Sequence, residues 1–469
     1  MKNQKFPPSD RKYVAFVGAG SANMFAVLRI IDSGFDPSQI LLIDRGKSPC
    51  DRCRSGRDIV EGFAGAGLWS DGKMVYSEHD DASIVSLEDK QKYHPIIREM
   101  VDRFGVGYET VTKPVDFDPE TLGIGYSMKL LQSTVYHLGT DRNVELGKRM
   151  FDFIIKSGVN VLMETEVVSL AKGDDGVVMI SCKRLGTQSY ECQYIQWGTG
   201  KVGVKQFNEL CSYYGVKKGS GSANVGFRFE MMMNDKVKNI VHNYQYDFKF
   251  SKGYRFQMDG YYFYVDVRTF CVNNGAAYVI EEPAYIEGVE YKTYNGHGYG
   301  LDNPEKNNGR TNFGVIARIR SNHPNFDANR VHSEYIKAFF DAPVYHGSAF
   351  DKDVMLGGKI RTSIGISSND RFIVDILCDV SYFIDDFMIE IEKILGISEY
   401  RAHFPEIKLA GGIVETCRGF VDYNRVLPNV SWVGDCCTGV VGIVPSAVTG
   451  LMAVDAFIEK NRHILFGRC

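Results

Sequence analysis

The N-terminal part of the chain alternates short apolar runs with amphipathic, helix-like stretches. An apolar run covers 13–17, a helical stretch follows as far as Gly34, and a second apolar run covers 40–43. Residues 142–156 repeat the helical period, and 159–163 form another apolar run. Apolar runs of strand length separated by helices are typical of β–α–β units with a parallel sheet. The pattern therefore predicts an α/β domain at the start of the chain.

Two strand-rich regions follow this α/β pattern. Strands are predicted at 167–172, 177–183 and 190–197, and tight turns between them indicate a small antiparallel meander. From about residue 224 to 368, tyrosine and phenylalanine crowd into alternating stretches such as 261–267, which indicates a β-rich domain. Such an aromatic stretch is expected to pack within its sheet, although a stacking surface for nucleic-acid bases is the alternative. Helices are predicted again at 328–340, 380–395 and 446–460.

These patterns predict one fold class and three chain segments. We expect a Rossmann-like α/β domain, with a parallel sheet and a small antiparallel meander, into which a β-rich α+β substrate domain is inserted. The predicted boundaries are 1–217 for the first part of the α/β domain, 218–404 for the insert and 405–469 for the C-terminal part. The first part includes a helical and loop excursion at about 76–140.

The turn after the first apolar run has the chemistry of a dinucleotide site. Gly18 would make the tight turn, and Gly20 would let the backbone approach a pyrophosphate. The helix that begins near Ser21 would direct unpaired N–H groups at that group. Asp44 ends the second strand, where a carboxylate can accept hydrogen bonds from ribose hydroxyls. A purely structural turn is the alternative.

The third glycine of this motif is replaced by Asn23. Its side chain is expected either to push the helix and strand slightly apart or to hydrogen-bond a phosphate or a loop. The run at 219–224 resembles the glycine motif at 18–23, but no apolar strand precedes it. We therefore expect no second dinucleotide fold.

Composition and charge narrow the range of functions. The net charge is −4, so no global basic field exists to hold nucleic acid or an anionic membrane, although a local basic patch could. Residues 1–11 lack a signal-peptide core, and no apolar run is long enough to span a membrane. Eleven scattered cysteines favour reduced thiols and a cytoplasmic location. Among them, Cys50 and Cys53 form a C-x-x-C motif. The motif is either a redox pair or two ordinary thiols.

Taken together, the motifs resemble the flavoproteins of the glutathione-reductase-like fold, which have two dinucleotide-binding domains. In that group a first glycine turn binds the FAD pyrophosphate, a mid-chain strand lies against adenine, a G-T-G turn closes the site and a G-D pair holds the ribityl chain. The matching positions are 18–23 with Asp44, Val167, 198–200 and 434–435. The resemblance also implies that the helix opening at 442–444 faces the pyrimidine end of the flavin, where its dipole stabilises negative charge.

More narrowly, the chain is similar to the FAD-dependent dehydrogenase family. The stretches that carry this similarity are 65–73, 226–230, 267–271 and 295–297, with Asn312 downstream. The chain departs from the family at Asn273 and Asn274, where relatives tend to have Cys-Pro. The residues assigned to FAD by motif and resemblance are Gly18, Gly20, Ser21, Ala22, Asn23, Asp44, Arg45, Gly65, Ala66, Ser70, Asp71, Gly72, Lys73, Val167, Gly198, Thr199, Gly200, Gly434, Asp435, Gly442, Ile443 and Val444.

Four residues of the β-rich region are the catalytic candidates. Arg268 or Arg310 could clamp a substrate carboxylate or phosphate, and His297, between two glycines, could act as a general base. Cys271 is the fourth, and Cys436 and Cys437 could place a thiol near the flavin. The alternatives are paired arginines, a loop histidine and ordinary buried thiols. No metal site is expected.

The sequence thus predicts an FAD-dependent oxidoreductase of the dehydrogenase type, moving two electrons between the flavin and an organic substrate. NAD(P)H or oxygen could be the electron partner. A second hypothesis is an amine or amino-acid oxidase, or a lyase, acting on an aminoacyl group that nucleic acid could carry. A third, non-enzymatic hypothesis is a nucleic-acid-binding protein with structural FAD.

Overall fold

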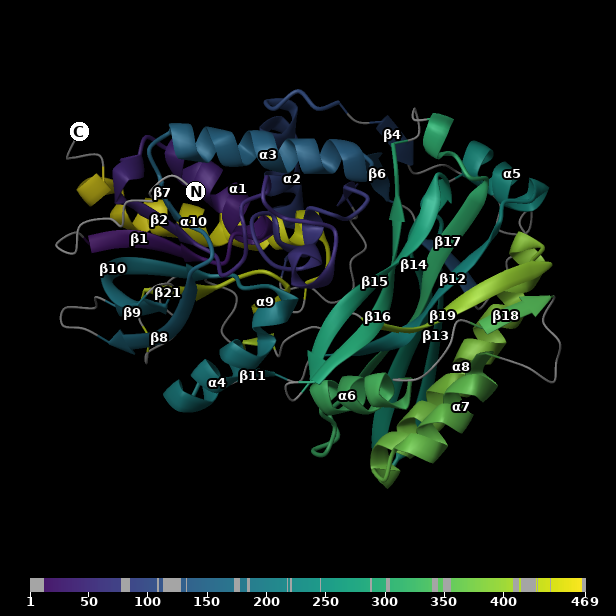
Figure 1. The fold of residues 1–469 in the computed structure, drawn as a ribbon. Coiled ribbons are helices and arrows are strands. Elements are labelled where there is room, and N and C mark those ends of the chain that lie inside the picture. The colour runs from purple at the N-terminus through teal and green to yellow at the C-terminus, as the bar shows by residue number, and fades with distance from the viewer. Residues whose placement is uncertain are drawn as a thin grey trace. The chain divides into compact units, whose positions relative to one another are not determined.

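A computed structural model describes residues 12–76, 85–107, 109–112, 128–131, 133–172, 178–183, 186–216, 218–219, 222–244, 246–286, 289–300, 304–339, 345–348, 356–407, 413–414, 427, 429–438 and 440–465. The chain forms two compact units, which Figure 1 traces by residue number. The α/β unit comprises Met1–Gly107, Asp141–Gly219 and Ala410–Cys469, and the β-rich unit comprises Tyr108–Thr140 and Ser220–Leu409. Residues 108–140, predicted as an excursion of the α/β domain, group with the β-rich unit, where 128–131 pair with 249–252.

The elements of the α/β unit follow the predicted order. Its strands are β1 (Lys12–Val17), β2 (Ile40–Ile43), β3 (Lys73–Tyr76), β7 (Asn160–Leu162), β8 (Glu166–Lys172), β9 (Val178–Lys183), β10 (Thr187–Trp197), β11 (Lys218–Gly219), β20 (Ile413–Val414) and β21 (Val430–Trp432). Its helices are α1 (Ser21–Asp32), α2 (Leu87–Asp102), α3 (Thr140–Lys156), α4 (Val204–Tyr214), α9 (Asp435–Thr438) and α10 (Ile443–Leu465), and short 3₁₀ turns cover Pro37–Gln39, Gly56–Ile59, Gly65–Gly67 and Lys201–Gly203.

The main sheet of this unit is parallel at its centre and antiparallel at one side. β1 pairs in parallel with β2 and β10, β2 with β7, and β10 with β21. The first half of β10 pairs antiparallel with β9, which pairs with β8. Residues 13–16 of β1 are fully buried, as expected for a central strand covered on both faces. The Rossmann-like sheet and the antiparallel meander are therefore confirmed.

The β-rich unit is built on a seven-stranded antiparallel sheet in the order β18-β19-β12-β17-β14-β13-β5. Its strands are β4 (Glu109–Thr112), β5 (Met128–Leu131), β6 (Thr134–His137), β12 (Ala223–Met232), β13 (Lys249–Met258), β14 (Tyr261–Gly275), β15 (Ala277–Ile286), β16 (Val289–Gly298), β17 (Arg310–Ser321), β18 (Tyr345–Ser348) and β19 (Glu399–Ile407). Its helices are α5 (Asp235–Asn243), α6 (Ala328–Ala338), α7 (Leu356–Ser367) and α8 (Arg371–Leu395), with a 3₁₀ turn at Pro304–Lys306.

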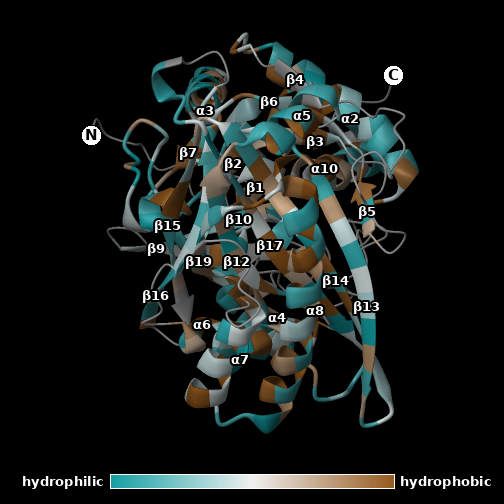
Figure 2. Cartoon of the chain, turned by 90° about the vertical axis from the view of Figure 1, so that its right-hand side faces the viewer, coloured by the Kyte–Doolittle hydropathy of each residue, from teal (hydrophilic) through white to brown (hydrophobic). Residues whose placement is uncertain are grey.

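The two faces of this sheet differ in polarity. Hydrophilic and hydrophobic colours alternate along β13 in Figure 2, as strand geometry requires. Phe227, Phe229, Val265 and Phe313 point to one face, where they form a single core with buried residues of α6, α7 and α8. The opposite, polar face is covered in part by the β15–β16 hairpin (Figure 1). Helices on one side and a hairpin on the other thus enclose the centre of the sheet.

Two predictions about this unit need correction. The helix predicted at 380–395 begins earlier, at Arg371, because the side chain of Asp370 accepts a hydrogen bond from the Ile373 N–H and caps the first turn. The aromatic stretch 261–267 is predicted to pack within the sheet. Phe263 does, but the side chains of Tyr262 and Tyr264 remain 47% and 51% exposed. In the part of the chain that the structure describes, no helix has the length and apolarity to cross a membrane.

Candidate functional site

The glycine turn after β1 is shaped by close backbone packing. Gly18 has φ of +88°, and a Cβ there would lie 2.4 Å from the carbonyl oxygen of Gly198. Only glycine tolerates both constraints. At Gly20, by contrast, a Cβ would have no atom within 4 Å. The turn is therefore tightly packed behind Gly18 and open at Gly20, where α1 begins.

Asn23 explains how the turn is held without a third glycine. Its amide nitrogen donates to the carbonyl oxygens of Val17, at 2.9 Å, and Gly18, at 2.7 Å. Its oxygen accepts a hydrogen bond from Gln196 Nε2 at 3.0 Å, and the residue is fully buried. Of the two expected roles, the side chain bonds to the turn itself and to β10. It stabilises the turn from behind.

Asp44 fixes the turn from the end of β2. Its two carboxylate oxygens accept hydrogen bonds from the backbone N–H groups of Ala19, at 2.7 Å, and Gly46, at 2.8 Å. A carboxylate has about four lone-pair directions, so both oxygens keep capacity for a ribose hydroxyl. Arg45, the neighbouring cation, forms an ion pair with Glu61 at 2.6 Å. Its charge is thus already matched within the unit.

The predicted glycine-rich loop lies against the same turn. Ala64 donates to the Ala19 carbonyl at 2.8 Å, and a Cβ on Gly65 would approach the Gly20 Cα at 3.3 Å. Ser21, Gly67 and Ile443 line a cavity of about 20 Å³ there, enough for about one water molecule. The start of α1, the loop and the start of α10 therefore meet at one place.

The remaining residues of the loop hold its shape. The Ser70 hydroxyl donates to the Gly67 carbonyl at 2.7 Å, Gly72 has φ of +64°, and Asp71 and Lys73 form a nearly buried ion pair at 2.9 Å. Ala66 lies within the 3₁₀ turn. The loop is thus internally bonded.

The two later turns lie beside each other and beside the first. Gly200 has φ of +65°, and a Cβ on it would lie 3.6 Å from the Asp435 carboxylate. Gly434, at φ +76°, donates its N–H to the Thr449 hydroxyl of α10 at 2.9 Å. Burial raises the pKa of Asp435 to about 6, although Lys201 and nearby backbone N–H groups act in the opposite direction. The strand ends of β1, β10 and β21 thus carry three neighbouring turns.

The other predicted cofactor residues have mixed environments. Ala22 is buried against Gly450 of α10. A Cβ added to Gly450 would lie only 2.0 Å from the Ala22 carbonyl oxygen. The Val167 carbonyl in β8 already accepts a hydrogen bond from the Gln206 side chain. Gly442, at φ +110°, precedes α10, whose first residues are Ile443 and Val444. The Thr199 hydroxyl accepts from Trp197 Nε1 at 3.1 Å.

Neither cysteine pair forms a disulfide in the structure. Cys50 and Cys53 are exposed thiols, and Cys53 Sγ lies 3.0 Å from the Asp58 carboxylate. Cys436 and Cys437 are buried, with their sulfur atoms 2.9 Å apart. A redox role for either pair stays a prediction.

In the β-rich unit, a buried ion pair lies between the sheet and the hairpin. Arg228 Nη2 lies 2.6 Å from Glu406 Oε1, and both side chains are fully buried. The guanidinium also donates to the Cys271 carbonyl at 3.0 Å and to the Asn295 side chain at 3.2 Å. Asn312 contacts the same guanidinium at 3.4 Å. Polar groups from four strands therefore converge on Arg228.

The predicted catalytic residues fall into two groups. Cys271 lies at a bulge in β14 with φ of +45°, and its carbonyl belongs to the Arg228 network. His297 is buried in β16, with Nε2 3.9 Å from Glu282 Oε1, and Glu282 in turn accepts a hydrogen bond from Asn295. These two residues are linked through Arg228 and Asn295.

The two arginine candidates lie apart from each other. Arg268 pairs with Asp266 on its own strand and is in register with Ile316 of β17. Arg310 is six residues away from Ile316 on β17, which corresponds to about 20 Å along the strand. Its side chain pairs with Glu230 at 3.0 Å. They cannot clamp the same substrate group.

Arg228, Glu406 and Asn295 were not among the predicted site residues. Polar and apolar residues alternate along 226–230. Such alternation ordinarily marks a solvent face. The signal that could have found them is the recurrence of asparagine and charged residues at alternate positions of several strands that pair with one another.

No protein-family model matches the chain, and no curated protein matches it. A flavoprotein/dehydrogenase from Cytophaga hutchinsonii is 12% identical, with a TM-score of 0.40, over 97% of this chain and 79% of that one. L-proline dehydrogenase from P. horikoshii is 8% identical, with a TM-score of 0.41, over 97% and 95%. Similarities this remote transfer no function to this chain.

Proposed function

We propose that the protein is an FAD-dependent oxidoreductase that moves two electrons between the flavin and an organic substrate. The observation that supports it is the meeting of three turns, from chain segments far apart in sequence, at the ends of parallel strands β1, β10 and β21. Ligands of open α/β sheets bind beyond the carboxyl ends of the strands. The open position at Gly20 fits a pyrophosphate, because a side chain there would fill the space.

The proposal assigns roles to this chain's own groups. Backbone N–H groups at Gly20 and Ser21 would bind the pyrophosphate, and Asp44 would accept hydrogen bonds from the adenosine ribose. Asp435 would hold the ribityl hydroxyls, and the start of α10 at Ile443 would face the flavin. FAD, when bound, accepts or donates the electron pair. His297 would hold or move a proton, and NAD(P)H or oxygen would serve as electron partner.

A single observation tests the cofactor: the visible spectrum of the purified protein. We expect a yellow protein whose flavin absorption bleaches with dithionite. Gly20→Ala should fold normally, since a Cβ meets nothing there, yet retain at least tenfold less FAD. Gly253→Ala in β13, where a Cβ also meets nothing, is the matched control. Colourless protein that refuses added FAD would overturn the proposal.

The substrate class needs a second experiment. The oxidised flavoprotein should be titrated anaerobically with NADPH and, separately, with amines and amino acids. Bleaching by NADPH alone supports the dehydrogenase type. Bleaching by amines or amino acids supports the oxidase alternative instead.

One surface favours the nucleic-acid alternative as a second candidate function. Arg255, Tyr264 and Arg320 are direct neighbours across β13, β14 and β17, and all are exposed. The ring of Tyr262 lies 6.3 Å from that of Tyr264, and the Arg255 guanidinium lies 5.9 Å from the Tyr262 ring centroid. Exposed aromatic rings beside cations are the means by which proteins bind single strands without sequence preference.

This candidate predicts salt-dependent binding of a fluorescent single-stranded oligonucleotide. Replacing Tyr262 and Tyr264 by alanine should weaken binding about tenfold or more, at roughly 1–3 kcal/mol per stacked base. The exposed Tyr382 of α8 provides a control substitution. Binding that persists in the double variant would exclude this surface.

A further inference from the structure

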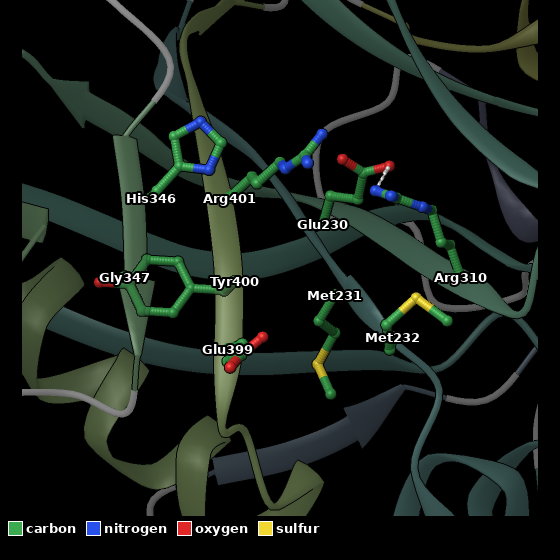
Figure 3. Close-up of a pocket in the computed structure, with 9 residues that line it drawn as sticks. All are labelled: Glu230, Met231, Met232, Arg310, His346, Gly347, Glu399, Tyr400 and Arg401. Carbon is green, nitrogen blue, oxygen red and sulfur yellow. Dashed lines mark ion pairs between the residues drawn. The ribbon is translucent and has the colours of Figure 1, made fainter.

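The β-rich unit contains a cavity of about 440 Å³ at one end of its sheet (Figure 3). This volume lies within the range of roughly 300–1,000 Å³ that small-molecule sites occupy. Its walls come from the end of β12, the starts of β17 and β19, and β18. The lining residues are Glu230, Met231, Met232, Arg310, His346, Gly347, Glu399, Tyr400 and Arg401.

One wall of the cavity carries a carboxylate whose charge is already matched. Glu230 Oε1 lies 3.0 Å from Arg310 Nη1, and Oε2 lies 3.5 Å from His403 Nε2. Burial opposes ionisation, but the nearby His403 and the charge of Arg310 outweigh it, so the pKa of Glu230 lies below its ordinary value. Glu230 therefore stays ionised, and Arg310 and His403 are occupied by it.

The cavity also presents one charge of each sign that has no ion pair within the described part of the chain. Arg401 and Glu399 are both exposed, and neither forms an ion pair among the described residues. They are two positions apart on β19, so both side chains leave the same face, about 7 Å apart along the strand. His346 is the direct neighbour of Arg401 on β18. Figure 3 shows the Arg401 side chain extending toward Glu230 over the cavity.

One apolar side chain, Met232, lies on the same face as these charges. The Met232 side chain is 58% exposed, so it is accessible to a ligand. Met231 and Tyr400 also border the cavity, but both are nearly buried, because their side chains leave the opposite face of their strands and join the core. Methionine adapts to ligand surfaces because its side chain is flexible and polarisable.

We propose that this cavity binds a zwitterionic α-amino acid with an apolar side chain. Arg401 would hold the carboxylate through two parallel hydrogen bonds, with His346 beside it, and Glu399 would accept hydrogen bonds from the ammonium group. Met232, on the same face as Arg401 and Glu399, would contact the side chain. This site lies within the β-rich unit and does not depend on FAD.

Isothermal titration of the full-length protein with L-leucine tests the proposal. Two half-ligands accompany it: 4-methylpentanoate, which carries only the carboxylate, and isopentylamine, which carries only the ammonium group. Leucine should bind at least tenfold more tightly than either. Equal binding of 4-methylpentanoate, or no binding of leucine, would overturn the proposal.

Variants locate the site. Arg401→Gln and Glu399→Gln should each lower the affinity for leucine about tenfold or more, because each removes one charge-assisted contact. Both residues are exposed, so the variants should unfold at the wild-type temperature. Lys292→Gln, on the β15–β16 hairpin and outside the cavity lining, is the matched control. Unchanged binding in both charge variants would place leucine elsewhere and refute the assignment.

Discussion

At the scale of single residues, the Arg228–Glu406 pair of the β-rich unit is an interaction that is costly to break. Both groups are fully buried, so removing one leaves the other charged without a partner. Breaking a buried pair in this way costs about 3–5 kcal/mol, whereas replacing both partners by apolar groups costs much less.

The first prediction is therefore a double-mutant cycle. Glu406→Gln and Arg228→Met should each lower the free energy of unfolding by about 3 kcal/mol or more in urea titrations, and the double variant Arg228→Met/Glu406→Leu by less than the sum. The exposed pair Lys292 and Glu281 serves as control, and its removal should leave the midpoint unchanged. Additive losses would mean that the two charges do not stabilise each other.

Asp435 gives the second prediction, a dependence of stability on pH. Its folded pKa of about 6 lies above the ordinary value near 3.9. Below pH 4 the group is protonated in both states. As pH rises from about 4 to 6 the unfolded state ionises first, so the folded state loses roughly 3 kcal/mol of stability.

Flavin-free Asp435→Asn should lack this loss. In urea titrations it should equal the wild type near pH 4 and exceed its stability by about 2–3 kcal/mol at pH 8. The same variant should bind FAD more weakly under the proposed function. Equal pH profiles for the two proteins would contradict the burial of this carboxyl group.

At the scale of elements, the contact between the β15–β16 hairpin and the sheet depends on glycine. A Cβ on Gly296 would lie 2.2 Å from Asn312 Oδ1 and 2.4 Å from Arg228 Nη1. Neither atom can move without breaking the buried network. The hairpin thus approaches the sheet as closely as a strand without a side chain allows.

The third prediction follows. Gly296→Ala should lower the free energy of unfolding by about 1–3 kcal/mol, the usual cost of overpacking. Gly253→Ala, on an exposed part of β13, should stay within about 0.5 kcal/mol of the wild type. Thermal or urea unfolding compares the two. A neutral Gly296→Ala would show that the hairpin can lift from the sheet at little cost.

Elements differ in how far the sequence predicts them. The turn at Gly18 and the acid at Asp44 are recognisable because the turn is local and the strand–helix–strand spacing is regular. The Arg228 network was not predictable, because Glu406 lies 178 positions away and its pairing depends on sheet register. Arg268 and Arg310 look equivalent in sequence, yet their partners Asp266 and Glu230 and their positions on the sheet separate them.

At the scale of the whole molecule, two cores give the fourth prediction. Because each unit has its own buried cluster, calorimetry should resolve two unfolding transitions. FAD at about 100 times its Kd should stabilise the folded α/β unit by about 2.7 kcal/mol and so raise the temperature of its unfolding transition. The unfolding temperature of the β-rich unit should not change. Gly20→Ala should abolish that shift. An equal shift of both transitions would mean that the units unfold together.

The α/β unit joins the two ends of the described chain, with consequences for its biosynthesis. α1 packs on α10, and Arg29 meets Asp455 at 2.7 Å, 426 positions later. At about 5–20 residues per second, the ribosome needs on the order of tens of seconds to make that partner. During this time the apolar side of α1 has no helix to cover it. A nascent chain of this protein therefore offers chaperones a long-lived target near its beginning.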